Sequence, residues 1–568
     1  MAMQADKRIE SHIDGQSWAL LALLSVIWGG SFMFVGVAVK ELPALLIVFA
    51  RVAIAAAILI PVHLVLQGPL PRDRRTWLAC AGMSLFNNVL TFTARDAAGN
   101  SSQKTLTVSY ASGTAQSYFL SPSGNDANDG LSAATPLKSF ARAFSRMQAG
   151  DELVLLDGVY SAAAGTGTIH WNNGSASAQI PSGTSTRATV VRAQNPGAVT
   201  IQGPLFIGRS TRKDSYIRVQ GITFEGGGSL YNTSFVTIKD SGFHGPFGIG
   251  TNDHDEGNTD NLIEDVWVWA SRQRIIAINY RAHRNVWRRV VVRGDGCGTA
   301  DCSGSGNPNV GFTVYDSMDV SVQNMLLVDR VLAGSDSPYA DFACAQHTPD
   351  PRWYFGRNEW LGVMSLNSPD IGFYCEPDQG ATLSPVLTIR DSVFWNARNG
   401  GVNLARSGSA HVIERLWIRS GGDGFRFAPE LASSNARIDG LNISGRGRYG
   451  LNSSVAAAGA SVSGDWQALT NQRGCSARCA MTEGPADGDS DSPPAAHLVR
   501  YGGDGMRFGT SGYRDPSPDS LWPWPNEDRI RQDMCRDTQR GFCADGMTLT
   551  RYLIGQSART PDRAAATR

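Results

Sequence analysis

The stretch Ile217-Arg218-Val219-Gln220-Gly221 opens a series of short units within residues 215–452. Most units alternate apolar and polar residues, and each ends at a polar residue or a glycine. The next unit, for example, is Val236-Thr237-Ile238-Lys239-Asp240. The units end at positions 221, 240, 265, 289, 324, 391, 415 and 440, with separations of 19, 25, 24, 35, 67, 24 and 25 residues. A period in the low twenties is typical of a stacked solenoid.

A second short strand recurs in each period, with a glycine followed by an apolar-x-apolar segment, as in Gly311-Phe312-Thr313-Val314 and Gly424-Phe425-Arg426-Phe427. A period of two indicates strands with one inward side and one outward side. Glycine, Asn and Asp between the strands suit the bends at the corners of a coil. The consensus of a leucine-rich horseshoe is missing. The sequence therefore predicts a mainly β protein, a right-handed parallel β-helix solenoid.

The two longer separations predict insertions in this solenoid. We expect them at about residues 294–310 and 333–358, with one extra coil near Trp360–Met364 inside the longer gap. Tryptophans also recur near one position of the coil, where they could form either a sugar-stacking platform or an aromatic stack along the sheet: Trp267, Trp269, Trp287, Trp395 and Trp417.

Length and charge limit the classes of protein. With 568 residues, the chain is long enough for three or four domains. Lys plus Arg and Asp plus Glu number 51 each, so no bulk charge points to nucleic acid as a partner. The 62 glycines and 18% charged residues suit a β protein rich in turns.

The first 90 residues have a different composition. Residues 18–39 and 52–66 contain no charged side chain, and residues 77–92 form a third, shorter apolar stretch. Stretches of this kind, extended by neighbouring apolar residues, can span about 30 Å of hydrocarbon. We therefore expect an N-terminal α-helical transmembrane segment, with residues 18–92 contacting the membrane.

This N-terminal region resembles a known family. Trp28-Gly29-Gly30-Ser31-Phe32 and Glu41-Leu42-Pro43-Ala44 look like the start of an EamA-type drug/metabolite transporter. The resemblance implies a ten-helix protein with two inverted repeats, and both repeats are needed for transport. It covers about residues 1–90, so transport by this chain is a distant alternative.

Residues 91–117 change character again. Two alternating strands around Asp96-Ala97-Ala98-Gly99-Asn100 resemble the last hairpin of a bacterial immunoglobulin-like domain, and a small-residue linker follows. Two truncated families that meet at one point indicate a fused or chimeric reading frame. The alternative is a genuine membrane-anchored architecture in which the hairpin is a spacer.

The solenoid has a recognisable beginning. Tyr118-Phe119-Leu120-Ser121-Pro122 and Ala149-Gly150-Asp151-Glu152-Leu153 resemble the N-terminal cap and first coil of secreted β-helix proteins, including pectate, alginate and chondroitin lyases. Residues 140–147 have the pattern of an amphipathic capping helix. The resemblance implies a β-helix over residues 118–465, followed by a C-terminal cap or extension over 466–568.

Cysteines and flanking charges predict the location. Besides Cys80 there are eight cysteines, and no His accompanies them at zinc spacing, so disulfides are expected. Three form close couples that leave Cys344 and Cys375: Cys297/Cys302, Cys475/Cys479 and Cys535/Cys543. Lys and Arg before the first apolar stretch and in the 68–76 loop indicate that these segments are cytoplasmic. Three crossings would make the chain membrane-anchored, with the β-helix extracytoplasmic.

Polar residues near the glycine-led strands are the candidate site. We expect the substrate-binding residues on the outward side to be Asn279, Arg281, Thr313, Asn403 and Asn452. The candidate catalytic residues are Arg426, Asp423, Arg398 and His283. Amides suit sugar hydroxyls and guanidinium groups suit uronate carboxylates. The alternative is that these residues are ordinary surface polar groups of a strand.

An acidic loop is the candidate metal site, with Asp253, Asp255, Glu256 and Asp260 as oxygen ligands. Calcium is the cofactor that such ligands would bind, although the fixed spacing of a calcium loop is missing and a solvated turn is the alternative. Asp253, Asp255 and Asp423 are also candidates for a paired-carboxylate hydrolase.

Together these features predict an extracytoplasmic β-helix protein that acts on or binds a polysaccharide or surface glycan. A polysaccharide lyase is favoured over a glycoside hydrolase. A non-catalytic, glycan-binding or adhesin-like surface β-helix is the alternative, because fold alone does not choose between them.

Overall fold

The computed structural model divides the chain into two compact units, Met1–Tyr110 and Ala111–Arg568. It describes residues 89–95, 101–107, 115–171, 177–209, 212–250, 257–269, 275–294, 310–330, 340–345, 356–376, 387–405, 411–428, 437–444, 451–453, 466–468, 481–482, 494–536 and 539–555.

In the first unit the described residues form a hairpin. Strands β1 (Val89–Arg95) and β2 (Ser101–Thr107) pair antiparallel, with Val89 opposite Thr107. The hairpin predicted here is confirmed. Within the described part of the chain, no helix has the length and apolar character needed to cross a membrane. The apolar stretches at 18–39 and 52–66 and residues 77–88 of the third stretch lie outside the described residues. The last part of the third stretch, residues 89–92, belongs to strand β1, so the predicted membrane contact is wrong there.

The second unit begins with the predicted cap. Strand β3 (Ser117–Leu120) is followed by helix α4 (Phe140–Arg146), which starts after Ser139 because the Ser139 side chain accepts a hydrogen bond from the backbone N–H of Arg142. Phe140, Ala143 and Phe144 are buried on one face of this helix. The helix therefore covers the apolar end of the coils.

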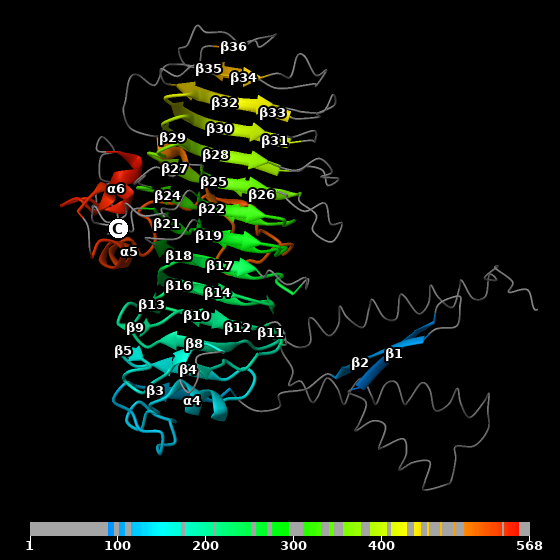
Figure 1. Cartoon of the computed structure of the whole chain (residues 1–568), viewed down its shortest axis with the longest axis vertical. Coiled ribbons are helices and arrows are strands. Elements are labelled where there is room, and N and C mark those ends of the chain that lie inside the picture. Colours follow the sequence, from blue (N-terminus) through cyan, green and yellow to red (C-terminus); the bar gives the residue numbers. More distant parts are fainter. Residues whose placement is uncertain are drawn as a thin grey trace, which may run out of the picture. The chain divides into compact units, whose positions relative to one another are not determined.

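The rest of the unit is mainly β, with two long sheets of parallel strands, and Figure 1 shows one coil stacked on the next. Strands of the twenty-stranded sheet are β3, β4 (Glu152–Leu155), β5 (Gly158–Ser161), β8 (Thr189–Ala193), β9 (Val199–Gln202), β12 (Ile217–Gln220), β13 (Thr223–Glu225), β16 (Thr237–His244), β18 (Leu262–Trp269), β20 (Val286–Arg288), β21 (Val291–Arg293), β23 (Ser321–Gln323), β24 (Leu326–Val328), β26 (Asn358–Leu361), β27 (Met364–Leu366), β29 (Leu387–Ala397), β31 (His411–Ser420), β33 (Arg437–Ser444), β35 (Trp466–Ala468) and β36 (Met481–Thr482).

The ten-stranded sheet runs beside it along the same coils. Its strands are β10 (Leu205–Ile207), β14 (Gly228–Leu230), β17 (Phe247–Gly250), β19 (Ile275–Tyr280), β22 (Val310–Tyr315), β25 (Ala340–Ala345), β28 (Ile371–Glu376), β30 (Gly400–Ala405), β32 (Asp423–Ala428) and β34 (Leu451–Ser453). Two small sheets also form near the start, from β6 (Thr168–Ile169) with β7 (Ser177–Ala178) and from β11 (Asp214–Ser215) with β15 (Thr233–Ser234).

The corners explain the sequence period. All eight unit ends at 221, 240, 265, 289, 324, 391, 415 and 440 have a positive φ, between 48° and 78°. Asp, Asn and Gly adopt this left-handed conformation more readily than other residues. Gly362, with φ 60°, is a ninth corner in the 67-residue gap. The extra coil predicted near Trp360–Met364 is therefore confirmed.

The predicted insertion at 333–358 is wrong in part, because β25 lies inside it and pairs with β22 and β28. The coil also continues beyond 465, since β35 and β36 extend the twenty-stranded sheet. The insertion predicted at 294–310 lies almost wholly outside the described residues.

Stacked apolar residues fill the solenoid. Phe312, Phe342 and Phe373 occupy one inward position on three successive strands and are fully buried. Cys344 and Cys375 are in register on β25 and β28 and form a disulfide. A second disulfide joins Cys535 and Cys543, so this predicted couple is confirmed. The Cys297/Cys302 and Cys475/Cys479 couples lie outside the described residues.

Residues 494–555, the C-terminal extension, fold back along the twenty-stranded sheet and lie beside the middle coils in Figure 1. Their elements are η3 (Pro494–His497), β37 (Arg500–Tyr501), β38 (Pro516–Ser517), α5 (Glu527–Met534), η4 (Gly541–Cys543) and α6 (Leu549–Ile554). Side chains of the extension such as Trp524, Ile530 and Leu553 pack on outward side chains such as Trp269, Leu326 and Trp395.

Candidate functional site

The solenoid has two outward faces, and the extension covers one of them. The tryptophans belong to this covered face or to the interior. Trp267, Trp269 and Trp395 are buried against the extension, and Trp287 lies in the solenoid core. Trp417 is partly buried against the same extension. The aromatic residues of the twenty-stranded sheet therefore pack within the protein instead of forming a sugar platform.

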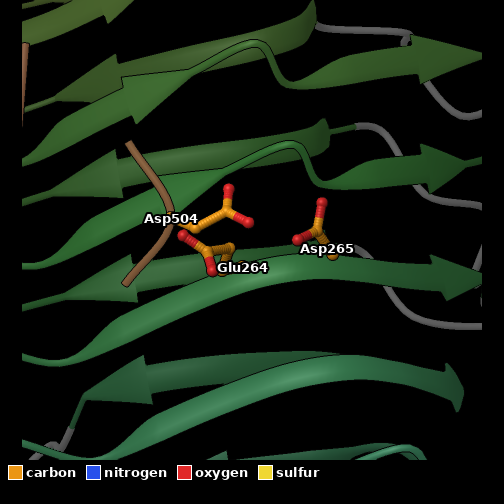
Figure 2. A group of neighbouring side chains, drawn as sticks. All are labelled: Glu264, Asp265 and Asp504. Atoms are coloured by element: carbon orange, nitrogen blue, oxygen red, sulfur yellow. The ribbon is translucent and has the colours of Figure 1, made fainter. Parts of the chain in front are cut away.

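An acidic group also lies under the extension. One carboxylate oxygen from each of Glu264, Asp265 and Asp504 lies within 4.8 Å of the others, as Figure 2 shows for these side chains. Glu264 is fully buried, while the Asp504 side chain is 57% exposed. Oxygen ligands at this spacing would suit a divalent cation. Whether these three carboxylates are free to bind a metal ion depends on the Lys and Arg side chains around them.

Three side-chain cations balance these three carboxylates. Arg288 Nη1 lies 2.8 Å from Glu264 Oε2, Arg289 Nε lies 2.6 Å from Asp265 Oδ1, and Lys239 Nζ lies 3.0 Å from Glu264 Oε1. Burial raises the pKa of Glu264, but Arg289, Lys239 and Arg288 outweigh burial and hold it below its usual value. The group is therefore an ion-pair network that fastens the extension to the solenoid.

The ten-stranded sheet has the other outward face, which we call the open face. A pair of tyrosines ends two neighbouring strands there. The ring centroids of Tyr280 and Tyr315 are 5.4 Å apart, and the guanidinium carbon of Arg281 lies 5.0 Å from the centroid of Tyr280. Arg281 Nε lies 3.4 Å from Asp316 Oδ2. Parallel register places Tyr280 directly beside Tyr315, so the aromatic pair and the ion pair each join two successive coils.

The phenol groups of this pair remain protonated at neutral pH. Burial raises the pKa of Tyr280, and burial followed by the charge of Asp316 raises the pKa of Tyr315 to about 12. These hydroxyls are therefore hydrogen-bond donors and poor bases. A third tyrosine, Tyr374, donates its hydroxyl to Glu376 on the same sheet.

A polar column crosses the open face next to this pair. Thr313, Ala343, Tyr374, Asn403, Arg426 and Asn452 occupy equivalent positions on successive strands. The structure therefore brings four of the predicted site residues onto one line. Arg426 is exposed and Asn403 is half-buried, but Thr313 and Ala343 are each 4% exposed. The column therefore reaches the surface at β30 and β32 and is buried at β22 and β25, where Thr313 had been expected at the surface.

Asn279 does not belong to this column, and its predicted outward direction is wrong. It aligns with Ile249 and Val314 and is fully buried. Its side chain donates to the carbonyl of Ala282 at 2.8 Å. Ile276 and Ala277 are both buried, so the alternation shifts by one residue at this bend. Sequence reasoning had assumed unbroken alternation.

His283 is also part of the interior. It is 4% exposed, and its Nδ1 accepts a hydrogen bond from the backbone N–H of Met318 at 3.1 Å. Burial, followed by the charge of Arg284, lowers the pKa of His283 to about 4. His283 therefore lies inside the coil and away from the surface of the open face, and the catalytic role predicted for it stays a prediction.

Asp260, a predicted calcium ligand, has both oxygens engaged. They accept hydrogen bonds from Arg284 Nε at 2.9 Å and Nη2 at 2.6 Å. The two residues are one coil apart, so the register itself makes the pair. The other predicted ligands, Asp253, Asp255 and Glu256, lie outside the described residues.

Arg398 and Asp423 lie at the edge of the open face where the strands begin. Asp423 opens β32 and aligns with Gly400 at the start of β30, and Arg398 lies in the turn just before β30. Arg398 and Arg426 are exposed, and neither has an ion pair with a carboxylate of the described residues. Arg281, Arg284, Arg288 and Arg289 each have one.

Sequence reasoning missed the tyrosines. Tyr280 and Tyr315 are 35 residues apart, which equals the separation between the unit ends at 289 and 324. Each is followed by a charged residue, Arg281 and Asp316. Aligning the sequence by this period would have shown the pair.

A comparison with known families matches the N-terminal region of the chain. Residues 16–112 match the EamA-like transporter family, nearly the extent of the first compact unit. No curated protein matches the sequence. Structures similar to the chain include pectate lyase Pel9A, with 14% identity, a TM-score of 0.35 and coverage of 60% of this chain and 78% of that one.

Two further structures are carbohydrate-active enzymes. A mannuronic acid specific polysaccharide family 6 lyase from human gut microbiota has 15% identity and a TM-score of 0.35, with coverage of 62% of this chain and 86% of that one. The catalytic domain of a GH87 alpha-1,3-glucanase has 12% identity and a TM-score of 0.33, with coverage of 59% and 68%.

Proposed function

We propose that the chain recognises an extended polysaccharide on the open face of the ten-stranded sheet. The observation that carries the proposal is the pair of Tyr280 and Tyr315, one strand apart, with Arg281 and Asp316 beside them. Aromatic faces offer large apolar contact at low conformational cost, and their hydroxyls donate to sugar oxygens. Strands recur about every 4.8 Å, so the face offers a regular series of contacts along a linear polymer.

Arg398 and Arg426 favour an acidic polysaccharide. Both are exposed and have no carboxylate partner among the described residues, whereas a guanidinium group binds a carboxylate through two parallel hydrogen bonds. Asn403, one strand from Arg426, adds an amide for hydroxyl groups. The charges of the face therefore suit uronate units near the coils of β30 and β32, where Arg398 and Arg426 lie, and neutral units near the two tyrosines.

Lyase chemistry needs a neutralised carboxylate and a base for the sugar carbon proton. The arginines satisfy the first requirement. The raised pKa values of Tyr280 and Tyr315 do not favour these groups as the base. We therefore propose glycan binding on the open face first. Lyase activity is a second, more specific proposal, which the product analysis described below tests.

The test uses purified residues 111–568, which form one compact unit, with polygalacturonate, alginate, chondroitin and neutral glycans. Tyr315→Ala should weaken binding by about 2- to 10-fold, because an aromatic contact contributes about 0.5–1.5 kcal/mol beyond its buried area. Tyr315→Phe retains the ring and should stay within about 2-fold of the parent. Equal binding by the Ala and Phe variants would show that the Tyr315 ring does not contact the glycan, and would contradict binding on the open face.

Product analysis separates the classes of protein. Absorbance from an unsaturated uronate indicates a lyase, new reducing ends alone indicate a hydrolase, and retention without turnover indicates a binding protein. Failure to bind any of the glycans would contradict the proposal.

We also propose that the solenoid lies outside the cytoplasm. Disulfides Cys344–Cys375 and Cys535–Cys543 support this, because disulfides persist mainly in oxidising compartments. Protease added to intact spheroplasts should cleave the solenoid, whereas a protected solenoid with free thiols would place it in the cytoplasm.

A further inference from the structure

A carboxyl group that the sequence analysis did not select lies at the strand-start edge of the open face. Asp370 directly precedes β28, and its backbone carbonyl accepts hydrogen bonds from the N–H groups of Asn399 and Gly400. The side chain is 8% exposed, and its Oδ1 accepts a hydrogen bond from Asn399 Nδ2 at 2.8 Å. It therefore lies just inside the surface, below the exposed Asn399.

The register relates Asp370 to Asp423. Ile371 aligns with Gly400 and Gly400 aligns with Asp423, so Asp370 and Asp423 belong to coils two apart. Two strand spacings are about 10 Å. This is the spacing of the two backbones, and the roughly 6.5–9.5 Å between the carboxyl groups of inverting glycosidases is a distance between side chains that such a backbone spacing permits.

The two carboxyl groups have different surroundings. Asp370 is close to the buried pair of Arg330 and Asp341, in which Arg330 Nε donates to Asp341 Oδ1. Burial and the charge of Asp341 raise the pKa of Asp370, whereas Asn399, Arg330 and Arg398 lower it, and the pKa lies above its usual value. Asp423 is half-buried at the start of β32. Unequal environments are what a pair needs if one member is to give a proton while the other stays ionised.

Two arginines without an ion pair among the described residues complete the group. Arg398 lies in the turn between Asp370 and Asp423, and Arg426 lies three residues after Asp423 on the same strand. Next to Asn399 in the register is Gly422, which has no side chain, and a Cβ there would lie 1.8 Å from the carbonyl oxygen of Asn399. This edge of the sheet therefore has two carboxyl groups and two arginines, together with one position, Gly422, that has no side chain.

We propose that this edge is a hydrolytic site for an acidic polysaccharide, in which Asp370 is the proton donor, Asp423 is the base, and Arg398 and Arg426 hold a uronate carboxylate. The inference rests on the proposed polysaccharide recognition. Asp370 gives its proton to the glycosidic oxygen as the bond from that oxygen to the sugar carbon breaks. Asp423 takes a proton from a water molecule, whose oxygen forms the new bond to the same carbon.

The main test measures turnover and binding with the full chain and acidic polysaccharides. The parent should release new reducing ends without unsaturated uronate. Asp370→Asn should lower kcat by about 10²- to 10⁴-fold and change KM little, because proton transfer by one group contributes that much. The matched control is Asp157→Asn. Asp157 also accepts hydrogen bonds from an Asn side chain, Asn195, but lies near the first coils, and its substitution should leave kcat unchanged.

A second variant tests the role of Asp370 through its pKa. Asn399 is exposed, so Asn399→Ala should keep the fold and lower the thermal unfolding temperature only slightly, through the lost hydrogen bond to Asp370. Loss of its hydrogen bond should raise the pKa of Asp370, and a proton donor with a higher pKa works up to a higher pH. The alkaline limb of the kcat profile should therefore move to higher pH. An unmoved limb, or a move to lower pH, would remove Asp370 as the proton donor.

The outcomes separate this inference from the proposed function. Glycan binding without new reducing ends would overturn the hydrolytic site and leave recognition by the open face intact. Unsaturated products would replace hydrolysis by elimination and also overturn it. Absence of binding by the parent chain would contradict both proposals.

Discussion

The two outward faces of the solenoid arise from the same coils, yet their charged residues differ. On the covered face, Arg288, Arg289 and Lys239 are paired with carboxylates, and Arg288 and Arg289 are buried while Lys239 is partly exposed. On the open face, Arg398 and Arg426 remain without such partners among the described residues. A paired, buried cation is a structural group, whereas an exposed cation without a partner can bind a ligand. The difference supports the proposal that the ligand binds on the ten-stranded sheet.

The covered face also shows the cost of burying charge. Removing ions from water is unfavourable unless each finds a partner and satisfied hydrogen bonds. Arg288 meets this requirement with Glu264 and Gln323 in the solenoid and with the carbonyl of Met506 in the extension. Stability of the solenoid and docking of the extension are therefore coupled.

Removal of the extension should have the largest effect. A chain that ends at residue 493 would expose the buried Trp267, Leu326 and Trp395 together with the ion-pair network. Each large apolar side chain contributes about 1.5–3 kcal/mol on burial, so we expect loss of the cooperative fold. Thermal unfolding and dye binding measure this.

The matched deletion removes residues 1–110, the other compact unit, and should leave the unfolding temperature unchanged. A truncated solenoid that unfolds at the parent temperature would show that the extension is a passive cover.

The substitution Arg288→Met should destabilise the protein by about 3–5 kcal/mol. Its side chain is fully buried, and its loss leaves Glu264 with an incomplete set of partners. Urea unfolding measures the change. Arg426→Met on the open face is the control and should stay within about 0.5 kcal/mol, because the side chain is exposed. Similar losses for both variants would contradict the distinction between the faces.

Acid should loosen the extension through Asp504. Burial raises the pKa of this carboxyl, but Arg289, Lys239 and Arg500 outweigh burial and lower it below 3.8. A lowered folded-state pKa gives stability that is present above 3.8 and is lost as the pH falls through the lowered value. Asp504→Asn should therefore show a shallower loss of stability below pH 3.8. Asp519→Asn, on the exposed part of the extension, should follow the parent curve.

The smallest effect on stability, and a clear effect on binding, is expected from Arg426→Ala. The exposed guanidinium contributes little to folding, but its loss removes a charge-assisted contact of about 1.5–3 kcal/mol with a carboxylate. Retention of acidic glycans should fall, while neutral glycans should bind as before. Unchanged binding of both kinds would show that the ligand lies elsewhere.

Much of the candidate site could be predicted from the period. Thr313, Asn403, Arg426 and Asn452 form the expected column because each has the same place within a glycine-led strand. Asn279 could not be placed, because two consecutive buried residues shift the alternation. Asp370 was missed because its importance depends on neighbours from other coils, which share no local pattern with it.

The sequence by itself determined the coils. Their corners fall on Asp, Asn, Gly and a few Arg residues at a regular spacing, since the left-handed conformation is set by local backbone sterics and leaves a local signal. Tertiary structure alone decided which outward face is covered. Arg288 meets Met506 218 residues away, and Asn324 meets Val499 175 residues away. Such contacts depend on how the extension folds back, and no local pattern in either segment encodes its partner.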